Sequence, residues 1–230
     1  MKYLYFSLVM ILFSCQNVLS QNNAHQWGQF ERYKTENSKL ASDKKVKGRV
    51  VFMGNSITEN WYSIHPNFFV DNNYIGRGIS GQTSYQFLLR FRQDVIALYP
   101  EIVVLNAGTN DIAENTGVYD ENYTFGNIVS MVELAKASKI KVILTSVLPA
   151  ASFGWNPSVK NVKDKIISLN NLIKQYAENN KIEYVDYYGE MVYGNDGALN
   201  PDYTKDGVHP TAEGYILMEK MIKKVIDKVK

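Results

Sequence analysis

A serine, a histidine and an aspartate stand where they could together form an activated nucleophile. Ser56 lies in Gly54-Asn55-Ser56-Ile57-Thr58, at a predicted turn from a strand into a helix, whose N-terminus favours negative charge. A serine hydroxyl is a weak nucleophile until a base takes its proton. Asp206 precedes His209 by three residues, a spacing that lets the carboxylate hold one ring nitrogen while the other faces the serine. These residue types predict acyl transfer through a covalent intermediate.

Acyl transfer also needs hydrogen-bond donors for the oxyanion of its tetrahedral intermediate. Gly81, in the segment from Gly76 to Thr83, offers a backbone N–H that no side chain obstructs. Asn110, in Gly108-Thr109-Asn110-Asp111, offers a side-chain amide, and the backbone N–H of Ser56 supplies a third donor. The sequence therefore predicts an oxyanion hole made by Ser56, Gly81 and Asn110.

The segments that hold these residues resemble the four sequence blocks of the SGNH/GDSL hydrolase superfamily, which is named for its Ser, Gly, Asn and His. They run from residue 54 to residue 210 in the order that the family shows. Ser56 matches the nucleophile, and Gly81 and Asn110 match the oxyanion donors. Asp206 and His209 match the Asp-x-x-His block. The resemblance also implies a flavodoxin-like arrangement of a five-stranded parallel sheet, and a reaction without a metal or a nucleotide cofactor.

The sequence departs from the family at one position, and part of it also fits one rival motif. Asn55 replaces the aspartate of the usual Gly-Asp-Ser block. That aspartate is not a triad member, so we expect the reaction of the triad to be possible without it. Gly76-x-Gly78-x-x-Gly81 fits a dinucleotide-binding pattern, which needs an acidic residue about 20 positions on, at the end of the next strand. Glu101 has that separation but begins its predicted strand. The Gly-x-Ser-x-Gly elbow of α/β-hydrolases is absent.

The rest of the chain alternates strand-like and helix-like segments that would bring these loops together. Apolar runs such as EIVVLNA are typical of strands buried on both faces. The alternation predicts an α/β fold with three layers, a parallel sheet between helices, and reactive residues on the loops after the strands. Strands are predicted at 49–53, 73–76, 101–107, 141–148 and 183–187, and helices at 24–42, 84–98, 121–137, 159–179 and 211–229.

Residues 1–20 are predicted to be an export signal and not part of the fold. Lys2 is followed by an apolar run to Phe13, which is too short for a membrane span of about 20 residues. Leu12-Phe13-Ser14-Cys15 resembles a bacterial lipobox, in which Cys15 would be lipidated and attach the protein to a membrane. Alternatively, cleavage after Ser20 would release a soluble protein. Either processing predicts an exported protein, located in the periplasm, attached to the outer membrane as a lipoprotein, or secreted.

The composition is that of one globular domain and excludes several functions. Of the 230 residues 45% are hydrophobic, and the 25 basic residues nearly balance the 23 acidic ones. Without a basic excess, we expect no nucleic-acid partner. One cysteine excludes an intramolecular disulfide, and three histidines leave little for a metal site. We expect an N-terminal helical segment at 21–48 and a hydrolase domain at 49–230.

The family that the chain resembles covers lipases, lysophospholipases, thioesterases and carbohydrate esterases. Export, the lipobox-like cysteine and aromatic loop residues favour a serine esterase that removes short acyl groups, such as O-acetyl, from a carbohydrate. The alternatives are a lysophospholipase or thioesterase acting on lipid acyl esters, and a non-catalytic glycan-binding protein. Trp61, Tyr62 and Trp155 lie in or after loops near the predicted site. They are expected to form a substrate platform, with core packing as the alternative. The oligomeric state stays open.

Overall fold

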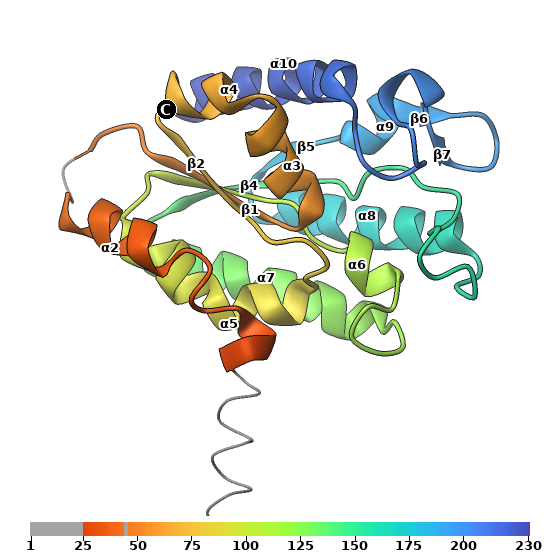
Figure 1. Ribbon diagram of the computed structural model, residues 1–230, viewed down its shortest axis with the longest axis horizontal. Coiled ribbons are helices and arrows are strands. Elements are labelled where there is room, and N and C mark those ends of the chain that lie inside the picture. The colour runs from red at the N-terminus through yellow and green to blue at the C-terminus, as the bar shows by residue number, and fades with distance from the viewer. Residues whose placement is uncertain (1–24, 44–45) are drawn as a thin grey trace, which may run out of the picture.

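The fold is built on one five-stranded parallel sheet. A computed structural model describes residues 25–43 and 46–230, so the predicted export signal at 1–20, with Cys15, lies outside the described residues. Every neighbouring pair of strands is parallel. The strands lie in the order β2 (Tyr74–Gly78), β1 (Val50–Gly54), β3 (Ile102–Leu105), β4 (Lys141–Thr145) and β5 (Glu183–Val185) (Figure 1). This is the flavodoxin-like order, and it confirms the predicted fold class.

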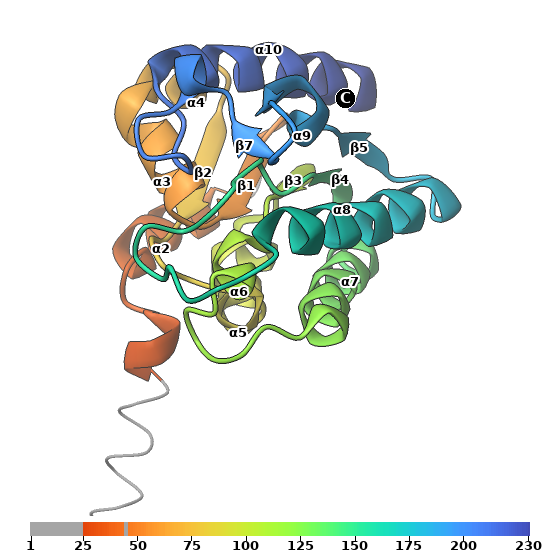
Figure 2. The same ribbon diagram turned by 90° about the vertical axis from the view of Figure 1, so that its right-hand side faces the viewer.

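Successive residues of each strand point to opposite faces of the sheet, and each face has its own helices. Val51 and Met53 of β1 belong to one core, whereas Val50 and Phe52 belong to the other. Figures 1 and 2 show the resulting three layers. One face is covered by α5 (Ser84–Asp94), α7 (Glu121–Ala137) and α8 (Val162–Asn179), and the other by α3 (Ser56–Ile64), α4 (Pro66–Val70) and α10 (Ala212–Val229).

Several short elements were not expected from the sequence, because they are too brief to show a hydrophobic period. The predicted helix over 84–98 ends as an α-helix at Asp94 and continues as the 3-10 turn Ile96–Leu98. The others are α4, α6 (Thr109–Ile112), α9 (Tyr187–Met191), the antiparallel hairpin of β6 (Val192–Tyr193) and β7 (Ala198–Leu199), and the 3-10 turn Pro201–Tyr203.

The N-terminal segment is helical but broken, which corrects the continuous helix predicted over residues 24–42. A short helical turn at residues 25–28 is followed by turns, and α2 (Lys34–Ser42) begins only after them. Gln29 has a φ of 50°, in the left-handed region, so the helix cannot pass through it. Tyr33 is buried while Trp27 remains 44% exposed. The segment lies beside α5, below the sheet in Figure 1.

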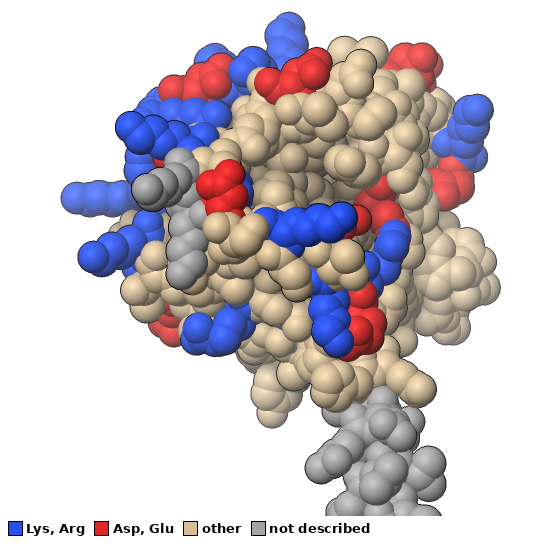
Figure 3. Space-filling model, turned by 60° about the vertical axis from the view of Figure 1, so that its left-hand side comes forward, with Lys and Arg blue, Asp and Glu red and all other residues tan. Residues whose placement is uncertain are grey.

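Charged side chains are mixed over the surface shown in Figure 3. Lys and Arg gather toward the left and upper left of that view, with Asp and Glu among them. None of the helices in the described part of the chain is long and apolar enough to span a membrane. Residues 25–43 and 46–230 also hold no group of three or more His, Cys, Asp or Glu side chains placed to bind a metal ion.

Candidate active site

Ser56 is the first residue of α3 and follows β1 after a single connecting residue. That residue, Asn55, caps the helix, because its side-chain oxygen accepts a hydrogen bond of 2.9 Å from the backbone N–H of Ile57. The junction is tight: a Cβ on Gly78 of the neighbouring strand would lie 2.2 Å from the backbone nitrogen of Glu59. Asn55 is 1% exposed, so it caps α3 without placing a charge in a buried site beside the nucleophile.

The three predicted triad residues form a continuous chain of hydrogen bonds. Ser56 Oγ lies 2.8 Å from His209 Nε2, and His209 Nδ1 lies 2.6 Å from Asp206 Oδ2. Asp206 and His209 stand in the loop before α10, which packs on the same face of the sheet as α3. A proton on Nδ1, donated to Asp206, leaves Nε2 free to accept the proton of the serine hydroxyl.

The loop around Asp206 fixes both its orientation and its charge. Gly207 turns the chain with a φ of 83°, and Asp206 Oδ1 then accepts the backbone N–H groups of Val208 at 2.9 Å and His209 at 2.8 Å. Partial burial works to raise the pKa of Asp206, but the backbone and ring N–H groups of His209 and the N–H of Val208 outweigh it and lower that pKa to about 2. Asp206 is therefore a carboxylate at neutral pH.

The three predicted oxyanion donors line one cavity with His209 and keep N–H groups free. Asn110 Nδ2 donates one hydrogen bond, to the backbone oxygen of Gln82 at 2.9 Å, and an amide has a second proton to give. No hydrogen bond within the described residues uses the backbone N–H of Ser56 or of Gly81. The arrangement can therefore donate to an oxygen atom that becomes negatively charged beside Ser56.

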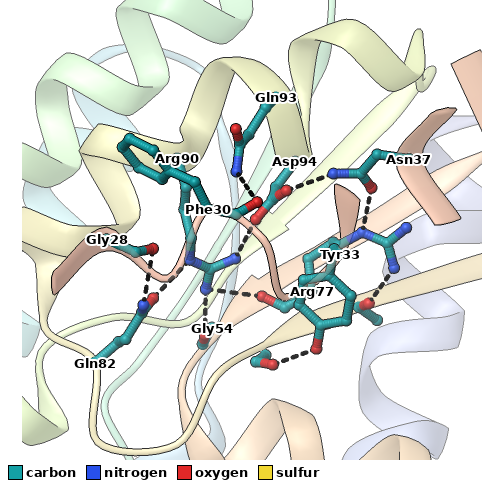
Figure 4. A network of polar contacts seen from close by, with 12 residues as sticks. Gly28, Phe30, Tyr33, Asn37, Gly54, Arg77, Gln82, Arg90, Gln93 and Asp94 are labelled. Carbon is teal, nitrogen blue, oxygen red and sulfur yellow. Dashed lines mark hydrogen bonds and ion pairs between the residues drawn. The ribbon is translucent and has the colours of Figure 1, made fainter. Parts of the chain in front are cut away.

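A buried arginine holds the loops behind these donors (Figure 4). Arg90 is 0% exposed, and its Nη2 donates to the carbonyl oxygens of Gly54 and Arg77, each at 3.0 Å. Its Nε donates to the side chain of Gln82 at 2.6 Å, and its Nη1 pairs with Asp94 at 2.8 Å. One guanidinium thus connects the end of β1, which leads to Ser56, with Gln82, whose backbone oxygen accepts from the Asn110 amide.

The N-terminal segment joins the same network (Figure 4). Asn37 Nδ2 donates to Asp94 at 2.6 Å, and Asn37 Oδ1 accepts from Arg77 Nε at 2.9 Å. The Arg77 guanidinium lies 4.4 Å from the centre of the Tyr33 ring, and the Tyr33 hydroxyl donates to the backbone oxygen of Gly78. Residues 25–43 are therefore bonded directly to the strand that precedes the oxyanion loop.

The cavity that holds the site, termed the active-site cavity below, has a volume of about 400 Å³, and most of the residues that line it have polar side chains. Trp155 is the one large apolar side chain in it, and its Nε1 donates to Asn115 Oδ1 at 2.9 Å. The lining residues are Ser56, Asn60, Ser80, Gly81, Asn110, Asn115, Trp155 and His209.

The expected aromatic platform is reduced to Trp155, whose ring centre lies 6.2 Å from that of His209. Trp61 is 3% exposed and stacks on Phe68 and Tyr215, so it is a core residue and does not reach the cavity. Trp61 is buried because it lies on the side of α3 that packs against α10. Tyr62 lies over Gly76, at a separate cavity next to the N-terminal segment.

Sequence reasoning missed two residues that fix the oxyanion loop. The Glu59 carboxylate accepts from Ser80 N at 2.8 Å and Ser80 Oγ at 2.5 Å, and it pairs with Arg32 at 2.8 Å. Burial works to raise the pKa of Glu59, but the hydrogen bonds from Ser80 and Arg32 lower it. Asn115 Nδ2 donates to the backbone oxygen of Gly81 at 3.1 Å. Both contacts join distant parts of the chain, so no local spacing signals them.

Known proteins share this fold and its sequence pattern. The sequence model of the GDSL-like Lipase/Acylhydrolase family matches residues 52–217. The crystal structure of a GDSL-like lipase from Bacteroides thetaiotaomicron superposes with a TM-score of 0.87 and 64% identity, covering 89% of this chain and 100% of that one. An N-acylneuraminate cytidylyltransferase of Escherichia coli is 25% identical over 177 residues, 77% of this chain. An acetylxylan esterase of Xylanibacter ruminicola is 27% identical over 150 residues, 56% of this chain. The chain spans only 40% and 29% of these two curated relatives.

Proposed function

Because the chain belongs to the GDSL-like lipase/acylhydrolase family, we propose that it hydrolyses short acyl esters, in particular O-acetyl groups on a carbohydrate. The observation that carries the proposal is the hydrogen-bonded chain from Ser56 through His209 to Asp206, with distances of 2.8 and 2.6 Å, at a cavity in which one large apolar side chain lies among polar ones. Esterase chemistry of the family and these contacts point to the same nucleophile.

The reaction proceeds through an acyl-enzyme. Ser56 Oγ attacks the ester carbonyl carbon while His209 Nε2 accepts its proton, and Asp206 stabilises the resulting imidazolium. The carbonyl oxygen becomes an oxyanion and accepts hydrogen bonds from the N–H groups of Ser56, Gly81 and Asn110. His209 then donates its proton to the leaving alcohol as the C–O bond breaks. Water attacks the acyl-enzyme with His209 as base, which releases the carboxylic acid and restores the serine hydroxyl.

The shape and lining of the active-site cavity support a short acyl group. A volume of about 400 Å³ lies near the lower end of the usual range for ligand sites. A long acyl chain needs an apolar groove to leave water, and Trp155 is the one large apolar side chain in the lining. The acetylxylan esterase among the relatives is in line with an acetylated glycan. If residues 1–20 are an export signal, the enzyme meets this substrate outside the cytoplasm.

A chain-length series tests the proposal. Rates would be measured on p-nitrophenyl esters from acetate to palmitate, with Ser56→Ala as the inactive variant and Ser63→Ala, on the exposed side of the same helix, as the matched control. Activity confined to acetate and butyrate, lost in Ser56→Ala and kept in Ser63→Ala, is expected. A preference for long chains would instead establish the lysophospholipase or thioesterase alternative. A folded protein without activity on any ester, including acetylated glycans, would leave only the non-catalytic alternative.

A further inference from the structure

A second cavity, termed the aromatic cavity below, lies next to the active-site cavity. It has a volume of about 230 Å³, and aromatic side chains from three separate parts of the chain line it. Trp27 comes from the N-terminal segment, Tyr85 from the first turn of α5, and Tyr119 from the connection between α6 and α7. Asp111, Thr116 and Asp120 add carboxylate and hydroxyl groups.

The two cavities share a wall. Asn110 and Asn115 line the active-site cavity, while their neighbours in the chain, Asp111 and Thr116, line the aromatic cavity. The hydroxyl of Thr116 lies 3.2 Å from that of Thr83 in the oxyanion loop, which braces this wall. The two cavities are therefore separated by the turn after α6, the segment that a substrate longer than one unit would have to cross.

The half-exposed ring of Trp27 is not explained by core packing. Its backbone is held in place, because the carbonyl oxygen accepts from Gln86 Nε2 at 2.8 Å, yet the residue remains 44% exposed. Trp61, in contrast, is 3% exposed in a cluster of rings. Because Trp27 also lines the aromatic cavity, this exposure leaves a large ring surface available to a ligand there.

The polar groups of the aromatic cavity suit a neutral ligand that is rich in hydroxyl groups. The residues that line it include two aspartates and no lysine or arginine, which disfavours a phosphate or a carboxylate. The two oxygens of the Asp111 carboxylate differ in their hydrogen bonds. Oδ1 accepts from the backbone N–H and hydroxyl of Ser84 and from the Thr124 hydroxyl, whereas Oδ2 accepts the Ser84 N–H at 3.0 Å and no other side-chain or loop donor of the described residues. Oδ2 can therefore accept a further hydrogen bond.

We propose that the aromatic cavity is a subsite for the sugar unit next to the acylated one, with its C–H faces against Trp27 and Tyr85 and a hydroxyl donated to Asp111. The proposal rests on the proposed function, since it assumes that the acyl group is carried by an oligosaccharide. A volume of about 230 Å³ suits a single ring better than a chain of them.

Kinetics on two substrates test the subsite in the full protein. Trp27→Ala is compared with Tyr193→Ala. This control also removes an exposed aromatic ring (59% exposed), but on the β6 hairpin, away from both cavities. On acetylated xylotriose, Trp27→Ala is expected to lower kcat/KM roughly three- to tenfold, mainly through KM. On p-nitrophenyl acetate, which has no sugar unit to place in the aromatic cavity, the same variant is expected to keep its rate. An equal loss on both substrates, or no loss on either, would overturn the proposal.

Binding without turnover separates failure of the subsite from failure of the proposed function. Xylotriose and cellotriose, both without acyl groups, are titrated into Ser56→Ala and Ser56→Ala/Trp27→Ala by calorimetry. The expected result is binding that the second substitution weakens roughly three- to tenfold, and it would stand even if the wild type cleaved no ester. If neither trisaccharide binds, the subsite proposal is overturned. Binding of phosphocholine that depends on Trp27 would overturn it in favour of a cationic headgroup, which aromatic rings also attract.

Discussion

Replacing Arg90 by methionine is expected to cost a large share of the stability of the protein. Arg90 and Asp94 are 0% and 2% exposed and lie 2.8 Å apart, so the substitution leaves a buried carboxylate without its cation. Removing one partner of such a pair costs about 3–5 kcal/mol, against a typical total of about 5–15 kcal/mol. Asn37 still donates to Asp94 at 2.6 Å, which places the expected loss toward the lower half of that range.

Urea unfolding followed by circular dichroism measures this loss. Arg92→Met, on the exposed side of the same helix, is the matched control and should change the free energy of unfolding by less than about 0.5 kcal/mol. Arg90→Met/Asp94→Leu should recover part of the loss, because no buried charge is then left alone. Recovery stays partial, since the carbonyl oxygens of Gly54 and Arg77 lose the hydrogen bonds that Arg90 donates, although Gly54 keeps one from the backbone N–H of Ile79 at 3.2 Å. A loss below about 1 kcal/mol for Arg90→Met would refute this reasoning.

Three further results are expected. Asn110→Ala should lower kcat on p-nitrophenyl acetate by about 10²–10³ while the unfolding midpoint changes little by comparison, and an unchanged kcat would remove Asn110 from the oxyanion hole. Gly78→Ala should lower the Tm or prevent folding, since its Cβ would lie 2.2 Å from the backbone nitrogen of Glu59; a variant with wild-type Tm contradicts the tight junction. For Asp206, whose folded pKa of about 2 lies below the ordinary value of 3.8, the stabilisation is complete above pH 3.8 and is lost as the pH falls toward 2. The free energy of unfolding of wild type and Asp206→Asn should therefore converge over that range, and a constant difference would speak against the lowered pKa.

The alternation of strands and helices and the closeness of Asp206 to His209 could be predicted from the sequence because their signals are local, whereas the flavodoxin-like arrangement of the sheet is implied by the family resemblance. Strands buried on both faces appear as unbroken apolar runs, and Asp206 and His209 are three residues apart in one loop. The loops that carry Ser56, Gly81 and Asn110 follow successive strands, so a parallel sheet must bring them to one edge.

What could not be predicted depends on contacts between distant segments. Trp61 and Trp155 both stand near loops in the sequence, and only the packing of α3 against α10 decides that the first is buried. In the sequence, Arg90 looks like any charged residue in a helix. Its role depends on carbonyl acceptors in β1 and β2, which are distant in the chain. The break at Gln29 is a single left-handed residue, which hydrophobic periodicity does not register.

Covalent labelling tests the central claim, that Ser56 is a nucleophile activated by His209, most directly. The protein is treated with paraoxon, which transfers a diethylphosphoryl group to an activated serine, and the adduct is measured by intact mass and located by peptide mapping. We expect one group per chain, on Ser56, with no adduct in Ser56→Ala and much slower labelling in His209→Asn. Labelling that persists in Ser56→Ala, or a folded wild type that hydrolyses esters yet takes no label, would contradict the account.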